Sequence, residues 1–219
     1  DLHSTSRRQR QMCIRDSTIG FLAPFVLGVY LSFCKFTTVT DARFIGLGNY
    51  AKILGDGDFL HSLWFTALFT IVTVLLINIF AFAVAMLLTK KIKGTNIFRT
   101  VFFMPNLIGG IVLGYVWQFV FNNVLIKMTN NISLLSKTNT AMMAIIVVYI
   151  WQYAGYIMLI YVTGLTQVPK DVLEASQIDG ANAVTTLFKI KIPMIAATIT
   201  ICTFLTLTSA FKQFDVNMA

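Results

Sequence analysis

Charged residues are scarce in this chain of 219 residues, where they make up 12% of the sequence against 57% for hydrophobic residues. The mean hydropathy of +0.76 is higher than a soluble domain of this length needs to fill its core. The scarcity of charge therefore argues against a soluble protein. We expect most of the chain to lie in lipid.

Side chains that carry catalytic or metal chemistry are also few. The three cysteines, Cys13, Cys34 and Cys202, are too few and too scattered for a disulfide framework or a metal-ligand spacing. The only histidines are His3 and His61, and no Ser/His/Asp, Cys/His or paired-carboxylate constellation occurs in the sequence. We therefore expect no metal, no cofactor and no enzymatic activity.

Signatures of nucleotide and nucleic-acid binding are missing as well. The chain contains no Gly-x-x-x-x-Gly-Lys-Ser/Thr pattern, so it does not itself cradle the phosphates of ATP. The formal net charge of +8 comes without a soluble basic domain. In a membrane protein, Lys and Arg mostly set the orientation. Nucleic acid is therefore not an expected partner.

Long apolar runs are what the sequence does contain. A hydrocarbon core of about 30 Å requires roughly twenty apolar residues as a helix, because no backbone group can stay unpaired there. Five stretches meet this requirement and predict an all-α, polytopic integral membrane protein. They are residues 18–36, 63–89, 100–121, 140–165 and 194–211.

The distribution of positive charge predicts the orientation. Residues 90–99 contain four Lys or Arg, which marks this short loop, and with it the N-terminus, as cytoplasmic. The loops 37–62 and 122–139 then lie outside, and the loop 166–193 lies inside. Within the first outer loop, residues 44–54 predict a short surface helix after a glycine-punctuated turn.

Residues 1–17 differ in composition from everything that follows. They contain four arginines and no apolar run, so they are neither a signal peptide nor a membrane span. We interpret them as a non-native leader, because the run 8–17 resembles translated sequencing-adapter sequence. A natural basic cytoplasmic tail is the alternative.

The inner loop begins with a predicted short helix. Pro169 can open it because the first helical position needs no N–H, and Asp171 complements the helix dipole in the first turn. The helix extends over residues 169–178. Asp179 and Gly180 then break it, since glycine adopts the left-handed conformation at little cost.

A second short helix with one apolar face follows the break, and Pro193 introduces the fifth apolar stretch. Two short helices joined by a tight turn make a compact knob that a cleft on another protein could hold. A loop helix lying on the membrane surface is the alternative. The apolar residues at helical spacing are Val184, Leu187, Phe188 and Ile192.

The loop is similar to the EAA motif of ABC-importer permeases, which reads Glu-Ala-Ala, three residues, Gly, nine residues, Ile, one residue and Leu-Pro. Two positions depart conservatively from the motif, with Ser176 for the second Ala and Ile192 for Leu. The residues in register are Glu174, Ala175, Gly180, Ile190 and Pro193.

Four segments, one of them a wider form of this motif, resemble the sugar-importing branch of these permeases, and most of all the first of two non-identical subunits of the maltose and glycerol-phosphate type. The resemblance covers residues 18–219 and implies a helix bundle of the type I ABC-importer permease kind. Such permeases have at least six spans, so we expect a sixth, C-terminal span to be missing here. The segments are residues 44–50, 98–105, 174–181 and 211–215.

The resemblance also implies the partners and the working parts. Residues 166–193 would form a coupling loop seated in a separate ATPase subunit in the cytoplasm. A second permease subunit, an extracytoplasmic solute-binding protein and a sugar or sugar derivative complete the system, which lies in the cell inner membrane. The implied coupling residues are Glu174, Ala175, Ser176, Asp179, Gly180, Ala181 and Pro193.

Polar residues inside the apolar stretches are candidates for a substrate path, because burying them unpaired is costly. Such residues also join helices by hydrogen bonds, and both interpretations stay open. A glutamine beside a tryptophan would suit the hydroxyls and the apolar face of a sugar. The candidates are Asn78, Asn106, Gln118, Trp151 and Gln152.

An ion-coupled secondary transporter or a membrane scaffold is the alternative function. Ion-coupled carriers place ionisable groups or broken helices near the middle of the membrane. The five apolar stretches carry no Asp or Glu well inside them. This absence favours an external source of energy.

Overall fold

The computed structural model describes residues 18–36, 38, 41–90, 94–126 and 138–213. The expected leader, residues 1–17, lies outside the described part of the chain. The chain divides into two compact units, Asp1–Trp64 and Phe65–Ala219, and helix α4 (Gly57–Leu88) begins in the first and continues in the second. Each unit is described by itself.

The first unit is a helix, a small hairpin and a second helix. A π-helical turn, η1 (Thr18–Leu22), leads into α2 (Ala23–Ser32), and two short antiparallel strands follow. The short helix predicted within residues 44–54 is present as α3. The remaining bounds are β1 (Cys34–Lys35), β2 (Arg43–Phe44) and α3 (Gly48–Gly55).

The first apolar stretch is shorter as a helix than predicted. The apolar helix covers Ile19–Ser32, fewer than the roughly twenty residues that cross a bilayer. It stops because the chain enters β1, whose extended residues pair with β2 instead of continuing the helix. The prediction of a continuous helix over residues 18–36 is therefore wrong at its C-terminal end.

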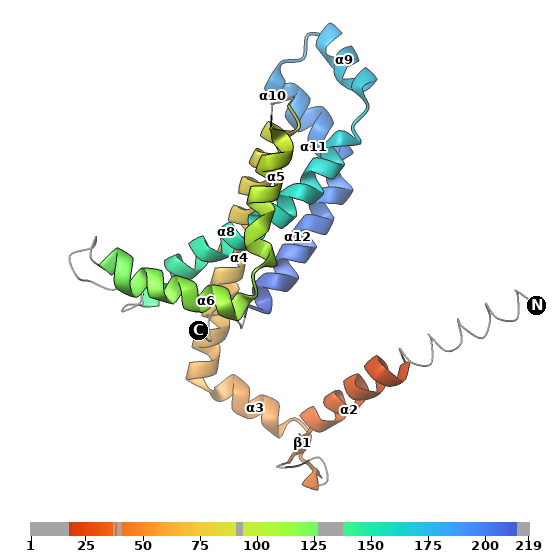
Figure 1. Ribbon diagram of the computed structural model, residues 1–219. Helices are drawn as coiled ribbons and strands as arrows, with labels where there is room; N and C mark the ends of the chain where they lie inside the picture. The colour runs from red at the N-terminus through yellow and green to blue at the C-terminus, as the bar shows by residue number, and fades with distance from the viewer. Residues whose placement is uncertain (1–17, 37, 39–40, 91–93, 127–137, 214–219) are drawn as a thin grey trace, which may run out of the picture. The chain divides into compact units, whose positions relative to one another are not determined.

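The second unit is a helix bundle with a protruding loop (Figure 1). Two of its helices, α4 and α8 (Thr138–Thr166), are long and apolar enough to cross a membrane as straight rods. The others are α5 (Thr95–Phe103), η3 (Met104–Leu107), α6 (Gly110–Phe119), η4 (Val120–Leu125), α9 (Lys170–Ile178), α10 (Ala183–Thr186), η5 (Leu187–Lys191), α11 (Ile192–Met194) and α12 (Ala196–Phe211).

The third predicted span is bent instead of straight. The helical segments Thr95–Leu107 and Gly110–Val124 meet at 95°. The backbone is extended at Ile108 and Gly109, with ψ of 129° and 137°, so the helical hydrogen bonds stop there. Just before them, Pro105 has no N–H to donate. A straight span over residues 100–121 is therefore wrong.

The fifth predicted span follows a second bend, of 72°, between Ala183–Met194 and Ala196–Phe211. Backbone hydrogen bonding continues across this bend, where the Ile195 N–H donates to the Lys191 carbonyl at 3.1 Å. If each bent pair is one span, the described part of the chain contains up to four spans by length and composition.

Helix α8 packs against α5, η3 and α12 at the centre of the second unit. Glycines in α8 permit close approach. A Cβ built at Gly155 would lie 1.7 Å from the Phe102 carbonyl oxygen, so only glycine fits against the α5 backbone there. The buried core includes Ile77 and Ala81 of α4, Ile157 of α8 and Cys202 of α12.

Large apolar side chains also cover the outside of this unit. Ile79 and Phe204 are each about two-thirds exposed, and many others point away from the core. Soluble monomers rarely expose apolar area on this scale. The exterior, like the composition, fits a helix bundle surrounded by lipid.

Candidate coupling loop and substrate pocket

The chain between α8 and α12 folds into two short helices and a turn, as the sequence predicts. Helix α9 begins at Lys170 instead of Pro169, because Pro169 is extended, with ψ of 136°, and precedes the first helical residue. Asp171 lies in the first turn, where its charge complements the helix dipole.

Helix α9 ends in a Schellman motif, in which two backbone bonds close the last turn. The Ala181 N–H donates to the Ser176 carbonyl at 2.9 Å, and the Gly180 N–H donates to the Gln177 carbonyl at 3.1 Å. Gly180 has φ of +78°, which confirms the predicted left-handed residue. A Cβ there would meet nothing within 4 Å, so the backbone conformation, and not space, requires glycine.

The second helix starts directly after this turn with its own cap. Asn182 is extended, and its Oδ1 accepts a hydrogen bond from the Thr185 N–H at 2.8 Å. Helical structure then continues from Ala183 to Met194, and Pro193 lies two residues before the bend at Ile195. Sequence reasoning missed the cap, although asparagine one residue before a helical run is its usual signal.

One side of the loop is attached to the bundle. Val168 and Ser176 are buried, and Leu173 packs against the core. The Ser176 hydroxyl donates to the Leu173 carbonyl at 2.7 Å, which satisfies the buried oxygen. Leu173 and Val168 thus attach this side of the loop to the bundle, while the predicted coupling residues Glu174, Ala175 and Asp179 are exposed.

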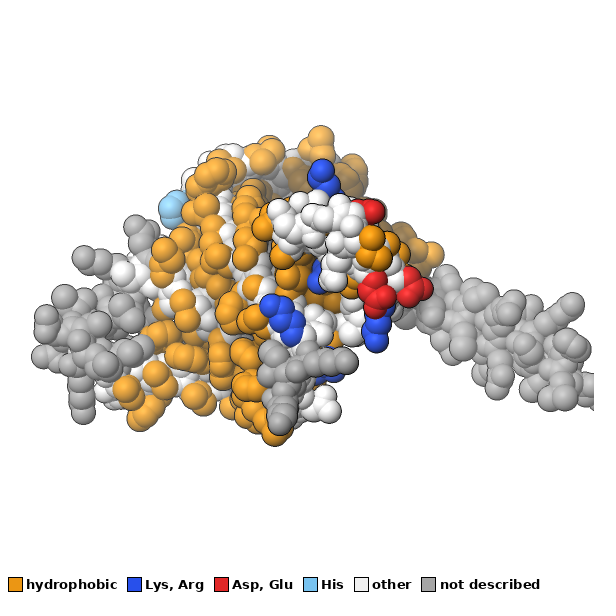
Figure 2. Space-filling model, turned by 90° about the horizontal axis from the view of Figure 1, so that it is seen from above, with side chains coloured by type: hydrophobic (Ala, Val, Ile, Leu, Met, Phe, Trp, Pro, Cys, Tyr) orange, Lys and Arg blue, Asp and Glu red, His pale blue; other side chains and the backbone are white. Residues whose placement is uncertain are grey.

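The outward side of the loop combines charge with unpartnered apolar side chains. Glu174, Ala175 and Asp179 are exposed, and Ala181 is half-buried. Ile178 is 87% exposed, an unusual degree for isoleucine. Val184 and Phe188 are also exposed. Seen from the α9 and α10 end, acidic and basic side chains gather on the protruding loop (Figure 2).

A polar pocket lies at the 95° bend. It has a volume of about 260 Å³. Gln152 of α8 is buried there, and its Nε2 lies 3.5 Å from the Ile108 carbonyl oxygen, a long hydrogen bond. Its Oε1 is buried and has no hydrogen-bond partner among the described residues. The lining residues are Asn106, Leu107, Ile108, Gly109, Gly110, Gln152, Tyr153 and Gln213.

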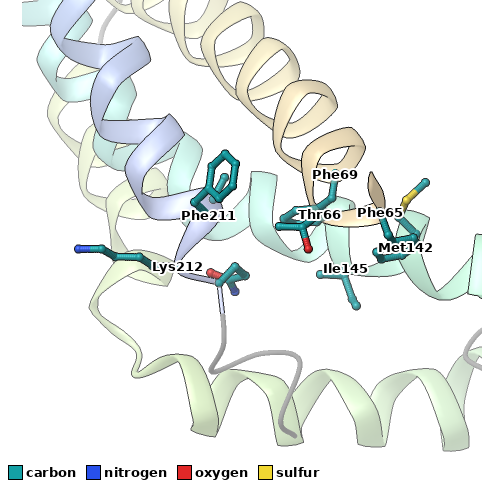
Figure 3. Close-up of a pocket in the computed structure, with 9 residues that line it drawn as sticks. Phe65, Thr66, Phe69, Met142, Ile145, Phe211 and Lys212 are labelled. Atoms are coloured by element: carbon teal, nitrogen blue, oxygen red, sulfur yellow. The ribbon is translucent and has the colours of Figure 1, made fainter. Parts of the chain in front are cut away.

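A second cavity has a volume of about 230 Å³ and shares the lining residue Gln213 with the polar pocket. Figure 3 shows its labelled lining: aromatic rings from α4 and the end of α12, aliphatic groups from α8, and Lys212 after α12. Sequence reasoning did not select Gln213 or Tyr153; Gln213 lies just outside the fifth apolar stretch, residues 194–211.

The other three predicted substrate residues do not line the polar pocket. Asn78 ties three helices together: its Nδ2 donates to the Thr206 hydroxyl at 3.0 Å, and its Oδ1 accepts from the Tyr161 hydroxyl at 2.8 Å. Gln118 is exposed on α6. Trp151 contacts the edge of Trp117, with ring centres 5.6 Å apart. For Asn78, the packing interpretation is the one that its contacts support.

Family comparison gives these features a context. Residues 93–217, which include both bends and the loop, match the model of the family described as binding-protein-dependent transport system inner membrane component. The matched region is more than half of the chain. The chain belongs to this family. It is therefore a transport permease subunit of the inner membrane and not an enzyme.

Individual relatives agree with the family match. The permease is 38% identical over 207 residues to the "Probable starch degradation products transport system permease protein AmyD" of Thermoanaerobacterium thermosulfurigenes, with 92% of this chain and 71% of that protein covered. It is 29% identical over 206 residues to the multiple sugar-binding transport system permease protein MsmF of Streptococcus mutans, with 90% and 71% covered.

A solved structure agrees in fold. A chain of a bacterial alginate ABC transporter, crystallised in complex with an alginate pentasaccharide-bound periplasmic protein, superposes with a TM-score of 0.78. The match covers 94% of this permease and 72% of that chain at 16% sequence identity. The predicted all-α fold of the ABC-importer permease kind is confirmed.

Proposed function

We propose that this permease is a subunit of an ATP-driven importer for sugars or sugar derivatives and that residues 166–193 couple it to a separate ATPase. The observation that carries the proposal is the two-helix knob around Gly180, closed by the Schellman motif, whose outward side presents Ile178 and Glu174. Relatives named for starch degradation products and multiple sugars support the substrate class.

The knob is well connected for mechanical coupling. Helix α9 follows α8 after a few residues, and the helical segment Ala183–Met194 continues into α12 across a hydrogen-bonded bend. A displacement of the knob is thus transmitted to two membrane helices at once. In this proposal a cleft on the ATPase surrounds Ile178, buries its side chain and accepts the charge of Glu174, while Gly180 and Pro193 fix the angles.

The polar pocket is the proposed substrate path. Gln152 offers a buried amide oxygen without a described partner, and Asn106 lies in the same lining. Amide groups donate and accept hydrogen bonds, as sugar hydroxyls do. The bend that forms the pocket also lets the α5–α6 segment change its angle. The pocket contains Gln152 and Asn106 but neither Gln118 nor Trp151, so we restrict the proposed path to Gln152 and Asn106 among the predicted residues.

The remaining partners follow from the same proposal. A solute-binding protein delivers the substrate on the outside, and a second, non-identical permease subunit completes the path. The knob and residues 90–99 lie on the cytoplasmic side of the membrane in this proposal. The N-terminus lies on the same side. The proposed permease domain is residues 18–219.

The coupling role is tested by single substitutions in the knob. A tagged full chain purified from membranes that contain its transport system should retain a protein that hydrolyses ATP. We predict that Ile178→Lys loses this ATPase, because the charge would have to be buried in the cleft. Asn123→Lys, which adds the same charge to exposed η4, is the matched control and should retain it. Retention by both variants at equal expression would contradict the coupling assignment.

A further inference from the structure

A groove in the first unit is not used by the transport function proposed above. It has a volume of about 580 Å³, within the range of small-molecule sites. One wall comes from the last turns of α2 and the start of the hairpin, and the other comes from α3. The lining residues are Gly28, Leu31, Ser32, Phe36, Asn49, Tyr50, Lys52 and Ile53.

Specific hydrogen bonds hold the two walls of this groove in place. Asn49 Nδ2 donates to the carbonyls of Ser32 and Cys34, at 3.0 and 2.9 Å, and thereby ties the start of α3 to the end of α2. The hydroxyls of Ser32 and Tyr50 are 2.8 Å apart and bridge the helices a second time. The groove is therefore a built feature and not a loose gap between two helices.

Positive charge accompanies the apolar walls. Lys52 lines the groove and lies in the last turn of α3, and no ion pair of its side chain occurs within the described residues. Lys35 and Arg43 are direct partners across the β1–β2 pair. Like charges directly opposite each other destabilise a strand pair. An anion near this segment would offset that repulsion.

The groove's own elements indicate its level in the membrane. Helix α2, which contributes Gly28 and Leu31, is apolar, and its large side chains such as Phe25 are exposed, which fits the acyl region. The hairpin and α3 that follow carry Lys35, Arg43 and Lys52, which fits the headgroup level.

We propose that this groove binds one anionic phospholipid. Its acyl chain lies along Gly28, Leu31 and Ile53, and its phosphate lies at Lys52. Apolar walls continuous with a lipid-exposed helix fit an acyl chain, and a basic residue at the interface fits an anionic headgroup. Asn49 holds the two walls in position and does not contact the phosphate.

The test is native mass spectrometry of the purified full chain titrated with phosphatidylglycerol or phosphatidylcholine. We expect phosphatidylglycerol to bind more tightly. Lys52→Gln should weaken its binding about fivefold, the effect of one basic residue at an anionic surface. Lys90→Gln, in the positively charged loop, is the matched control and should bind as the parent does. Equal binding of both lipids, or no effect of Lys52→Gln, would overturn the proposal.

The acyl part of the site is tested separately. A Cβ at Gly28 meets nothing within 4 Å, so Gly28→Leu should fill the groove without disturbing α2 and should displace the lipid. Gly20→Leu has equal space but lies outside the groove, and should bind normally. A benzoylphenylalanine in place of Phe36 should crosslink to phospholipid in membranes. Crosslinking to a protein instead would show that a polypeptide occupies the groove and would overturn the assignment.

Discussion

At the scale of single residues, Gly180 determines whether the knob can form. Its φ of +78° costs most residues that have a Cβ, asparagine and aspartate excepted, about 1–2 kcal/mol, which is a factor of about 5–30 in the population of the turn. We predict that Gly180→Val reduces transport into proteoliposomes by at least this lower factor. Valine is β-branched and adopts the left-handed conformation least readily.

Asparagine at the same position is the matched control for this prediction. Asn visits the left-handed region far more often than valine, and the space around Gly180 is open, so Gly180→Asn should keep most of the activity. Both variants should reach the membrane in equal amounts, as an immunoblot would check. If Val and Asn support the same transport, the turn geometry is not what the knob requires.

The sequence predicts the role of a residue correctly where backbone conformation alone determines that role. The break at Gly180 was predictable because glycine after a helical run favours a left-handed end. The role of Asn78 was not predictable, because the sequence of an apolar helix does not show whether an amide faces a substrate or a neighbouring helix. Only the packing of α4, α8 and α12 brings Tyr161 and Thr206 to its side chain.

At the scale of elements, hydropathy finds apolar segments but does not show their direction. Residues 100–121 are predominantly apolar, and the straight span expected there is bent by 95° because extended residues follow Pro105. The polar pocket exists because of this bend, so its lining could not be assembled from sequence. Gln152 was still found, since a glutamine inside an apolar stretch is conspicuous by itself.

The contact between α5 and α8 makes a testable element-level prediction. At Gly155 the added Cβ of alanine would overlap the Phe102 carbonyl, 1.7 Å away, so α5 has to move off α8. We expect Gly155→Ala to cost about 1–3 kcal/mol of stability, as overpacking does. Gly57→Ala, at the exposed start of α4 where a Cβ meets nothing, is the control. Equal thermal unfolding of both variants in detergent would show that α5 does not pack this closely.

At the scale of the whole molecule, the number of crossings determines which surfaces share a side of the membrane. Between Leu54 and Ile178 the chain runs through α4, the bent pair Thr95–Leu107 and Gly110–Val124, and α8. If the bent pair crosses once, the three crossings place α3 and the knob on opposite sides. If the pair is a re-entrant loop, the two remaining crossings place them on the same side.

Cysteine labelling separates these two topologies. In a background with Cys13, Cys34 and Cys202 replaced by alanine, Leu54→Cys and Ile178→Cys place a thiol at positions where the native residues are 66% and 87% exposed. We predict that an impermeant maleimide labels Leu54→Cys on intact spheroplasts but labels Ile178→Cys only after permeabilisation. The positive loop 90–99 puts the knob side in the cytoplasm.

A third position makes the outcome independent of the knob. Asn123→Cys lies on exposed η4, at the far end of the bent pair from residues 90–99. It should be labelled from outside together with Leu54→Cys if the pair crosses. Labelling of Asn123→Cys only after permeabilisation would make the pair a re-entrant loop. The polar pocket would then open toward the cytoplasm alone, and a path through Gln152 could not connect the two sides of the membrane.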